Sequence, residues 1–412
     1  MQRRKSSCPT AVTARLALIA IAGAVTAANA DVVTESNARA AEIVAASGLS
    51  TPAVNRVMAL VQTAVYAAAN SVSRRYPDDD FDLKAVSAAS IDAAIAAAQR
   101  AALSELLPSQ RGATEDAYLT ALRRLPDDAA RKAGIAAGQR AAAAVLAARR
   151  DDGAAAPDSY RPRTSPGVYI PTSGTVAPQW PARKPWLMSG AAEFRPGPPP
   201  ELTSERWARD YEEIKQIGSR NSPVRSAEQT AKARFWETTQ PSIYYGLVHN
   251  VATQSDRDVT QNARLFAAVT QAIDDAMIAV FDAKYHYGFW RPVTAIRNGD
   301  IDGNDSTGVD PAWAPFIETP LHPEYPCAHC IVAATVGAVL LGELGDKPQP
   351  IWRTVSATAD GAAREWTSIE AFVQEVADAR VYDGVHFRYS TEVGTAMGRQ
   401  IGALAVARRL RP

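Results

Sequence analysis

Two cationic side chains, Lys284 and Arg291, stand seven residues apart in a segment that reads KYHYGFWRP. On one helix this spacing returns both side chains to the same face after two turns, and Pro292 would end that helix. Two cations on one face can converge on a single anion. The same pair also has an ordinary use, because lysine and arginine near a helix end often interact with the terminal carbonyl groups.

A second segment reads HPEYPCAHC and ends at Cys330, directly before a long apolar run. A proline and small residues just before a helix leave backbone N–H groups pointing outward, and such groups bind anions. His329 would lie beside these groups. A histidine that is satisfied within the core at a helix start is the alternative.

A third segment begins at Arg380 and ends at His386, before the last predicted helix. Gly384 lies between them, and glycine permits the tight turn that would bring the arginine and the histidine to the same point. The three segments together supply cations, backbone amides and histidines. These are groups with which proteins bind a tetrahedral oxyanion.

The elements that position these segments are predicted from periodicity and composition. Residues 31–150 are rich in alanine with helical periodicity and are interpreted as an N-terminal helical scaffold. Residues 151–201 are rich in proline with interspersed aromatic side chains, which predicts a long ordered loop. Residues 202–412 form the second helical half, which carries the three segments.

Helical patterns in the second half cover several separate ranges, and period-two alternation is nowhere sustained. The expected helices span residues 202–218, 225–238, 257–284, 327–342 and 388–409. The predicted fold class is therefore all-α, a helical bundle. We expect the chemistry to lie among the facing helices of the second half.

The first thirty residues are predicted to be a signal peptide. Arg3 and Arg4 precede an uncharged stretch that ends with the residues ANA at Ala30. This predicts an exported protein, periplasmic or secreted. Removal of residues 1–30 takes four basic residues from 44 basic and 44 acidic ones, so 40 and 44 remain, a formal charge of −4. That charge argues against a nucleic-acid partner, and no later apolar run is long enough for a membrane anchor.

Two cysteines, Cys327 and Cys330, remain after that removal. Their CxxC spacing in an oxidising compartment is typical of a local disulfide or of a redox pair. No βαβ pattern surrounds them, which argues against a thioredoxin-like domain. The sequence alone leaves their pairing open.

The three segments resemble the motifs of the vanadium-dependent haloperoxidase and type 2 phosphatidic acid phosphatase (PAP2) superfamily. Those motifs are a lysine, six residues, arginine and proline; then proline, serine, glycine and histidine; then serine, arginine, five residues and histidine. The spacing within the segments and their order along the chain both match. The aromatic context Phe289-Trp290-Arg291 resembles that of the haloperoxidase branch, and a chain without membrane spans is similar to its soluble members. The resemblance therefore implies the helical-bundle fold of that branch.

The resemblance implies a role for each matched residue. Lys284, Arg291 and Arg380 would neutralise the oxygens of a bound vanadate, and phosphate can occupy the same site. His386 would be the axial group, which ligates vanadium in a peroxidase or attacks phosphorus in a phosphatase to give a phosphohistidine. His329 would be the acid–base residue. Taken as a whole, the implied cofactor-binding set is Lys284, Arg291, Cys327, Ala328, His329, Arg380 and His386, with backbone amides contributed near Cys327 and Ala328.

The sequence departs from the family pattern at four positions. The serine and glycine before the first histidine are Cys327 and Ala328, and the serine before the arginine is Ala379. Haloperoxidases of this type place an aspartate four residues after the axial histidine, where this chain has Ser390. The carboxylate that orients the imidazole is thus missing from its usual place.

Three functions follow from the resemblance and its departures. The leading one is a vanadium-dependent haloperoxidase-like enzyme that oxidises halide with hydrogen peroxide, so its partners are small molecules. The alternatives are a soluble acid phosphatase acting on phosphomonoesters and a degenerate oxyanion-binding protein without catalysis. The sequence predicts no oligomeric state.

Overall fold

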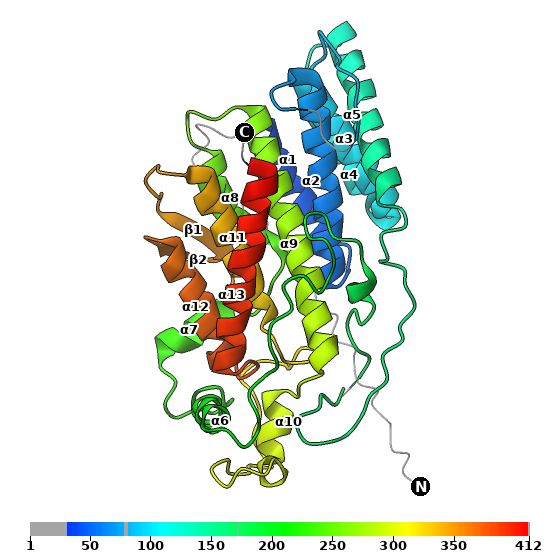
Figure 1. Cartoon of the computed structure of the whole chain (residues 1–412). Coiled ribbons are helices and arrows are strands. Elements are labelled where there is room, and N and C mark those ends of the chain that lie inside the picture. Colours follow the sequence, from blue (N-terminus) through cyan, green and yellow to red (C-terminus); the bar gives the residue numbers. More distant parts are fainter. Residues whose placement is uncertain (1–30, 78–80, 172, 411–412) are drawn as a thin grey trace, which may run out of the picture.

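The computed structural model describes residues 31–77, 81–171 and 173–410, so the predicted signal peptide lies outside the described residues. The described chain is built from helices with one small two-stranded sheet, which confirms the predicted all-α class (Figure 1). The helices are α1 (Val32–Ala45), α2 (Thr51–Ser73), α3 (Ile91–Leu106), α4 (Arg111–Leu122), α5 (Ala129–Ala148), α6 (Glu205–Ile217), α7 (Ala227–Phe235), α8 (Pro241–Ala252), α9 (Val259–Tyr287), α10 (Pro292–Arg297), α11 (Ala328–Leu344), α12 (Ile369–Tyr382) and α13 (Arg388–Ala405).

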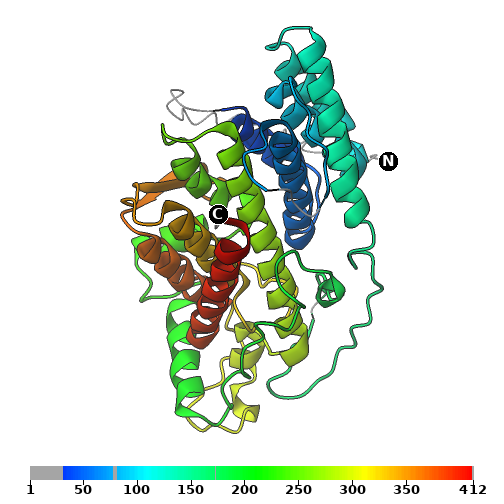
Figure 2. The same cartoon turned by 45° about the horizontal axis from the view of Figure 1, so that its top comes forward.

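The N-terminal helices pack closely because their contact faces carry small residues. Helices α3 and α5 lie side by side, and α2 packs on both of them and on α9. At Gly138 in α5, a Cβ atom would lie 2.1 Å from the carbonyl oxygen of Ala94 in α3. Only glycine permits this approach. The second view shows α3, α4 and α5 projecting beyond the rest of the molecule (Figure 2).

The long helix α9 connects the two halves. It begins at a capping box formed by Asp258 and Gln261, in which each side chain accepts from the other residue's backbone N–H. Helices α2, α11 and α13 all contact α9, and one hydrophobic core continues from the N-terminal helices through α9 to α11 (Figure 1). The position of its C-terminal end, where Lys284 lies, is therefore fixed from several sides.

The apolar run of the second segment forms α11, which is buried on nearly all sides, as expected for a helix without a polar face. It packs against α13, and a Cβ atom at Gly398 would lie 2.2 Å from the carbonyl oxygen of Ile331. Within the part of the chain that the structure describes, no helix combines the length and the apolar composition needed to cross a membrane.

The proline-rich segment is hydrogen-bonded to α9. Two neighbouring carboxylates of α9 hold it. Arg183 and the indole N–H of Trp186 donate to Asp274, with an Arg183 Nη1 to Asp274 Oδ1 distance of 2.5 Å. Asp275 accepts from the backbone N–H groups of Trp186, Leu187 and Met188 at 2.7, 2.7 and 3.0 Å. The loop is thereby bonded to the helix that carries Lys284.

The sequence analysis did not predict a β-hairpin and two helices, α8 and α12, of the second half. Strands β1 (Trp352–Ser356) and β2 (Ala362–Trp366) pair antiparallel, with Trp352 opposite Trp366. The buried positions of β1 alternate, but two of its three inward residues are Thr354 and Ser356, so the alternation does not show as hydrophobicity. Helices α8 and α12 were not among the predicted ranges either.

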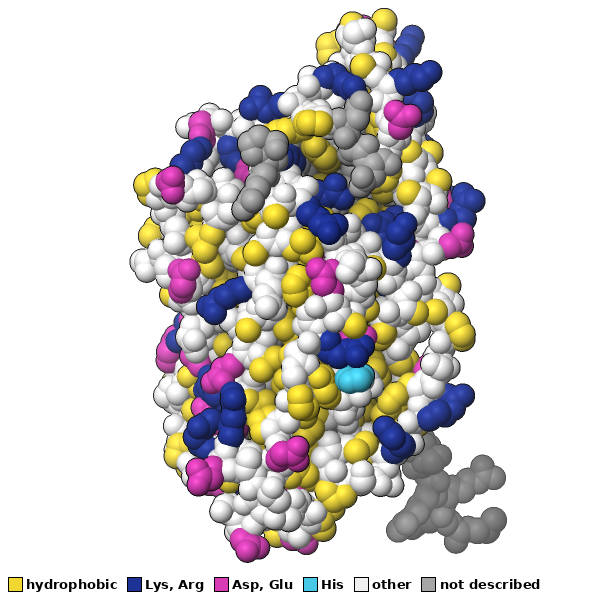
Figure 3. Space-filling view, in the orientation of Figure 1, with side chains coloured by type: hydrophobic (Ala, Val, Ile, Leu, Met, Phe, Trp, Pro, Cys, Tyr) yellow, Lys and Arg dark blue, Asp and Glu magenta, His cyan; other side chains and the backbone are white. Residues whose placement is uncertain are grey.

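The surface shown in Figure 3 carries lysine and arginine interspersed with aspartate and glutamate. This distribution agrees with the balanced charge of the sequence, 44 basic and 44 acidic residues. On this face the described side chains show no broad area of positive charge of the kind that binds nucleic acid.

Candidate functional site

Lys284 and Arg291 do not share a helix, so the expected two-turn spacing on one helical face is wrong. Helix α9 ends at Tyr287, and Gly288 caps it in the left-handed conformation with φ +58°. Arg291 is the N-cap of the next helix, α10, whose first residue is Pro292. The physical reason is that glycine ends a helix readily and proline is suited to start one.

The Lys284 ammonium is buried and faces the second segment. Its Nζ donates to the carbonyl oxygens of Pro323 and Glu324 at 2.9 and 2.7 Å. Burial and the neighbouring Arg291 hold the pKa of Lys284 well below its usual value. Two of its three N–H donors are used by carbonyl groups, which leaves one for an anion.

Arg291 joins all three segments. Its Nε donates to the carbonyl oxygen of His322 at 2.9 Å, and its Nη1 donates to that of Val385 at 2.8 Å. The same Nη1 lies 3.4 Å from Nε2 of His386. Burial lowers the pKa of Arg291 to about 10, so the guanidinium is charged at neutral pH.

Arg380 comes from the end of α12 and is completely buried. Its Nη1 donates to Oδ2 of Asp383 at 2.5 Å and to the carbonyl oxygen of Trp236 at 2.7 Å. Its Nε and Nη2 have no hydrogen-bond partner among the described residues. Gly384 follows with φ +78°, and after this turn the backbone N–H of His386 donates to the carbonyl oxygen of Arg380 at 3.3 Å.

His386 is buried between a carboxylate and a guanidinium. Its Nδ1 lies 2.8 Å from Oε1 of Glu324 and 3.4 Å from the hydroxyl of Ser390. Burial, followed by the charges of Arg291 and Lys284, lowers the pKa of His386 well below its usual value. The imidazole is therefore neutral at neutral pH.

Glu324 is the site residue that the sequence reasoning missed. Position 390, where the resembling haloperoxidases have aspartate, carries serine in this chain. Glu324 instead supplies the carboxylate at Nδ1 of His386. Burial raises the pKa of Glu324 to about 7, and its Oε2 has no partner among the described residues. A signal was present in the sequence, because Glu324 is the acidic residue within the second segment, HPEYPCAHC.

His329 lies in the first turn of α11. Its Nε2 is buried and has no hydrogen-bond partner among the described residues, whereas its ring hydrogen-bonds the backbone at Glu237. Burial and then the charge of Arg380 lower the pKa of His329 well below its usual value. A neutral ring with one free nitrogen is suited to accept a proton.

Cys327 is the N-cap of α11 and forms a disulfide with Cys330. A disulfide-bonded sulfur is not a free nucleophile. The Cys327 N–H donates to the carbonyl oxygen of Ser390 at 3.2 Å, so this amide is already used. The first-turn amides of Ala328 and His329 lack intrahelical acceptors and are the ones that can face an anion.

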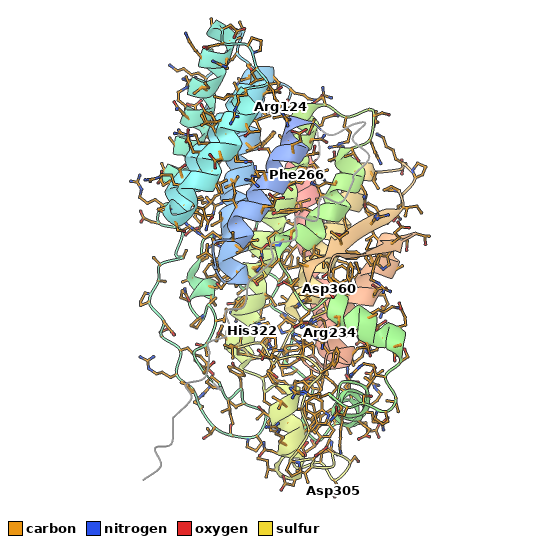
Figure 4. The ribbon with its side chains drawn as sticks, turned by 180° about the vertical axis from the view of Figure 1, so that it is seen from behind. Arg124, Arg234, Phe266, Asp305, His322 and Asp360 are labelled. Atoms are coloured by element: carbon orange, nitrogen blue, oxygen red, sulfur yellow. A yellow bond between two sulfur atoms is a disulfide. The ribbon has the colours of Figure 1, made fainter. Side chains whose placement is uncertain are left out.

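His322 and His286 differ in their relation to the site. The Nδ1 of His322 lies 3.0 Å from Nη2 of Arg291. Figure 4 shows His322 beside the C-terminal end of α9, far from Arg124 in the N-terminal half. His286 is exposed and packs against the ring of Tyr287 instead.

The arrangement as a whole fits an oxyanion. Three buried cations, Lys284, Arg291 and Arg380, stand against two buried carboxylates, which leaves an excess of positive charge. Unpaired buried N–H groups cost several kcal/mol unless a ligand satisfies them, as for any desolvated charged donor. The free donors of Arg380 are such groups, and the free nitrogen of His329 is a buried acceptor without a partner among the described residues. Among the described residues, no cluster of acidic or sulfur ligands offers a cation site.

Comparisons with known proteins point in one direction. A family model, the second helical-bundle domain of VCPO, matches residues 264–411. Vanadium chloroperoxidase of Curvularia inaequalis is 32% identical over 142 residues, a match that covers 28% of this chain and 23% of that protein. The chain thus matches about a quarter of the length of this relative.

Solved structures share the fold over nearly the whole chain. A bacterial vanadium-dependent iodoperoxidase has a TM-score of 0.77 at 23% identity, covering 92% of this chain and 96% of that one. An apo-type bacterial vanadium-dependent chloroperoxidase has a TM-score of 0.71 at 20% identity, covering 87% and 94%. Residues 264–411 are thus similar to the second helical-bundle domain of VCPO, and the chain as a whole shares the fold of the vanadium-dependent haloperoxidases.

Proposed function

We propose that this protein is a vanadium-dependent haloperoxidase that oxidises halide with hydrogen peroxide. The observation that carries the proposal is the cluster of three buried cations, with donors of Arg380 that no described residue satisfies. The similar proteins support it, because they are vanadium-dependent chloroperoxidases and an iodoperoxidase.

Vanadate, when bound, would supply a Lewis-acid centre that activates hydrogen peroxide toward halide. Lys284, Arg291 and Arg380 would hold its oxygens by charge-assisted hydrogen bonds. The amides of Ala328 and His329 at the start of α11 would add to this hold. All of these donors are fixed in place before the ligand arrives, so little reorganisation is needed.

The two histidines would have separate roles. His386 directs Nε2 toward Arg291, and its lone pair would bond to the vanadium. His329 would take a proton at its free Nε2 and return it later in the cycle. Its lowered pKa leaves the ring unprotonated and ready to accept a proton at neutral pH.

A phosphatase is the second candidate, because the three buried cations beside His386 could also hold a phosphoryl group. Cys327 stands where the resembling proteins have serine, and as a disulfide it offers no hydroxyl or thiol donor to a vanadate oxygen. The three cations and a nucleophilic His386 would still suffice to hold a phosphoryl group and form a phosphohistidine. Such an enzyme would hydrolyse phosphomonoesters.

We also propose that the protein is exported. The signal-peptide pattern of residues 1–30 and the Cys327–Cys330 disulfide both support this, because disulfides persist in oxidising compartments. Fractionation of the producing cells, with amino-terminal sequencing of the mature protein, tests the proposal. A chain that keeps residues 1–30 in the cytoplasm would contradict it.

A paired assay tests the function. Purified protein is incubated with vanadate, peroxide and chloride, bromide or iodide in one arm, and with a phosphomonoester without vanadate in the other. We expect vanadate-dependent halide oxidation and little ester hydrolysis. Ester hydrolysis that vanadate inhibits, with no halide oxidation, would establish the phosphatase instead. Oxyanion binding without either activity would identify a non-catalytic binding protein.

A further inference from the structure

Glu324 connects the three segments that form the site. Its backbone N–H donates to the carbonyl oxygen of Phe289 at 2.9 Å, and its own carbonyl oxygen accepts from Lys284 at 2.7 Å. Its Oε1 accepts from the Phe387 N–H at 3.1 Å and lies 2.8 Å from Nδ1 of His386. The residue is completely buried. The backbone of Glu324 is therefore held on both sides, and its carboxylate is held by the Phe387 N–H and the ring of His386.

The neighbours of His386 select one tautomer of its ring. The carboxylate of Glu324, which faces Nδ1, accepts hydrogen bonds, whereas the guanidinium of Arg291, which faces Nε2, can only donate them. Nδ1 must then carry the proton, and Nε2 must present its lone pair. That lone pair points to the side of the ring where the buried cations lie.

Ser390 shows where the carboxylate would otherwise stand. It lies four residues after His386, the position at which the resembling haloperoxidases carry aspartate. Its hydroxyl is 3.4 Å from the same Nδ1 that Glu324 contacts at 2.8 Å. An aspartate at position 390 is longer than this serine and would place its carboxylate beside Nδ1 of His386, the atom that Glu324 now contacts. Glutamate in the second segment and aspartate in the third are thus alternative ways to hold one ring nitrogen.

We propose that Glu324 is the positioning residue for His386 and makes the site selective for an oxyanion that bonds to Nε2. This inference rests on the proposed oxyanion site. A carboxylate beside three cations weakens the attraction for any anion held by charge alone. The same carboxylate strengthens the binding of an anion that accepts the lone pair of His386, because the carboxylate fixes and polarises the ring. Vanadate belongs to the second class, and phosphate bound without a covalent bond belongs to the first.

The test compares the affinities of two anions in the absence of peroxide. Calorimetry measures the binding of orthovanadate and of inorganic phosphate to the full-length mature protein. The variants are Glu324→Ala, Glu324→Gln, and Glu324→Ala combined with Ser390→Asp. The matched control is Glu318→Ala, which removes an exposed carboxylate from the same connection between α10 and α11.

In Glu324→Ala we expect vanadate affinity to fall about 10- to 100-fold, the usual effect of losing a residue that orients a metal ligand. Phosphate affinity should stay the same or rise. Ser390→Asp in the Glu324→Ala background should recover most of the lost vanadate affinity. The Glu318→Ala control should bind both anions as the parent does.

Nitrogen-15 NMR of labelled histidine gives a second measurement that does not depend on binding. In the parent protein His386 should be protonated at Nδ1, and in Glu324→Ala and Glu324→Gln this preference should weaken. Circular dichroism establishes that each variant is folded. If the combined variant does not fold, the NMR comparison of the two single variants decides the question.

Three results would overturn the inference. One is unchanged vanadate affinity in Glu324→Ala, a second is an equal loss of both anions, and the third is an unaltered tautomer. A parent protein that binds neither anion would instead refute the proposed function, so the two failures are distinguishable.

Discussion

The two halves of the molecule differ in whether their helices bury charged side chains. Among the described residues of α1 to α5, from Val32 to Ala148, no lysine, arginine, aspartate or glutamate is buried. The polar groups buried there are uncharged, such as Asn37 and Gln62. The C-terminal half buries Lys284 and Arg380 completely.

This difference separates stability from function. Buried charge is expensive, and a fold that needed only stability would replace it with apolar side chains. The N-terminal half does so with alanine and glycine at its helix contacts. The C-terminal half keeps cations without full sets of partners, as expected where a ligand supplies the missing interactions. Substitutions in the two halves should therefore have different consequences.

The largest effect is expected at the histidines of the C-terminal half. His329→Ala should still bind vanadate, while turnover falls by about 10²- to 10⁴-fold, because this residue acts only through a proton. His386→Ala should lose vanadate binding itself, since it removes the lone pair. Calorimetry and steady-state rates are measured on both variants after circular dichroism confirms their helix content. Full vanadate affinity and turnover in His386→Ala would refute the role of His386 as a vanadium ligand.

The next effect concerns the cations and compares the halves directly. Arg291→Ala or Arg380→Ala should lose about 2 to 4 kcal/mol of oxyanion affinity, because each removes a buried charged partner of the anion. Arg124→Ala is the matched control, since Arg124 is exposed in the N-terminal half and pairs with Glu35 at 2.5 Å. Its affinity should equal that of the parent. If all three variants bind the oxyanion with the same affinity, the proposed site is wrong.

A substitution at the N-terminal helix contact should change stability without changing binding. Gly138→Ala places a Cβ atom against the backbone of α3 and should lower the free energy of unfolding by about 1 to 3 kcal/mol. Gly112→Ala in α4 meets no atom within 4 Å and should stabilise the protein by up to about 1 kcal/mol. Chemical denaturation measures both. A loss of vanadate affinity in folded Gly138→Ala would break the division between the halves.

The smallest effect concerns acid. All five histidines lie in the C-terminal half, and His249 in α8 has its pKa lowered to about 4 by burial. The unfolded chain then binds more protons than the folded one between pH 6.5 and 4, so stability is present above pH 6.5 and is lost as pH falls. His249→Gln should reduce this loss by roughly 1 to 3 kcal/mol at pH 4. Identical denaturation curves for parent and variant from pH 7 to 4 would contradict the assignment.

The sequence predicted the parts of the fold and site that depend on local pattern. Alanine periodicity predicted the N-terminal helices, and proline with aromatic residues predicted the ordered loop. The turn at Gly384 followed from the backbone freedom of glycine. The matched motifs indicated the proteins to which the comparisons also find this chain similar. Each of these inferences uses residues that are close in sequence.

What the sequence did not predict depends on contacts between distant segments. Glu324 is separated by sixty-two residues from the histidine that it contacts, so its role could not be inferred from spacing. The end of α9 at Tyr287 was missed because the cation spacing suggested a continuous helix, although Gly288 is a good helix terminator. The hairpin was missed because polar residues occupy its buried face.

The loop that joins the halves offers a place where the polypeptide chain could be divided. Its stretch from Tyr160 to Pro166 is largely exposed, whereas Asp152 before it and Arg183 after it are buried and bonded at 2.8 Å. Asp152 also accepts from Arg56 of α2 at 2.8 Å. Two chains made separately, one ending and one beginning within this exposed stretch, would each keep its share of a common core and of these ion pairs. We therefore expect a polypeptide divided at this loop to reassemble by complementation, with every residue of the proposed oxyanion site on the second chain.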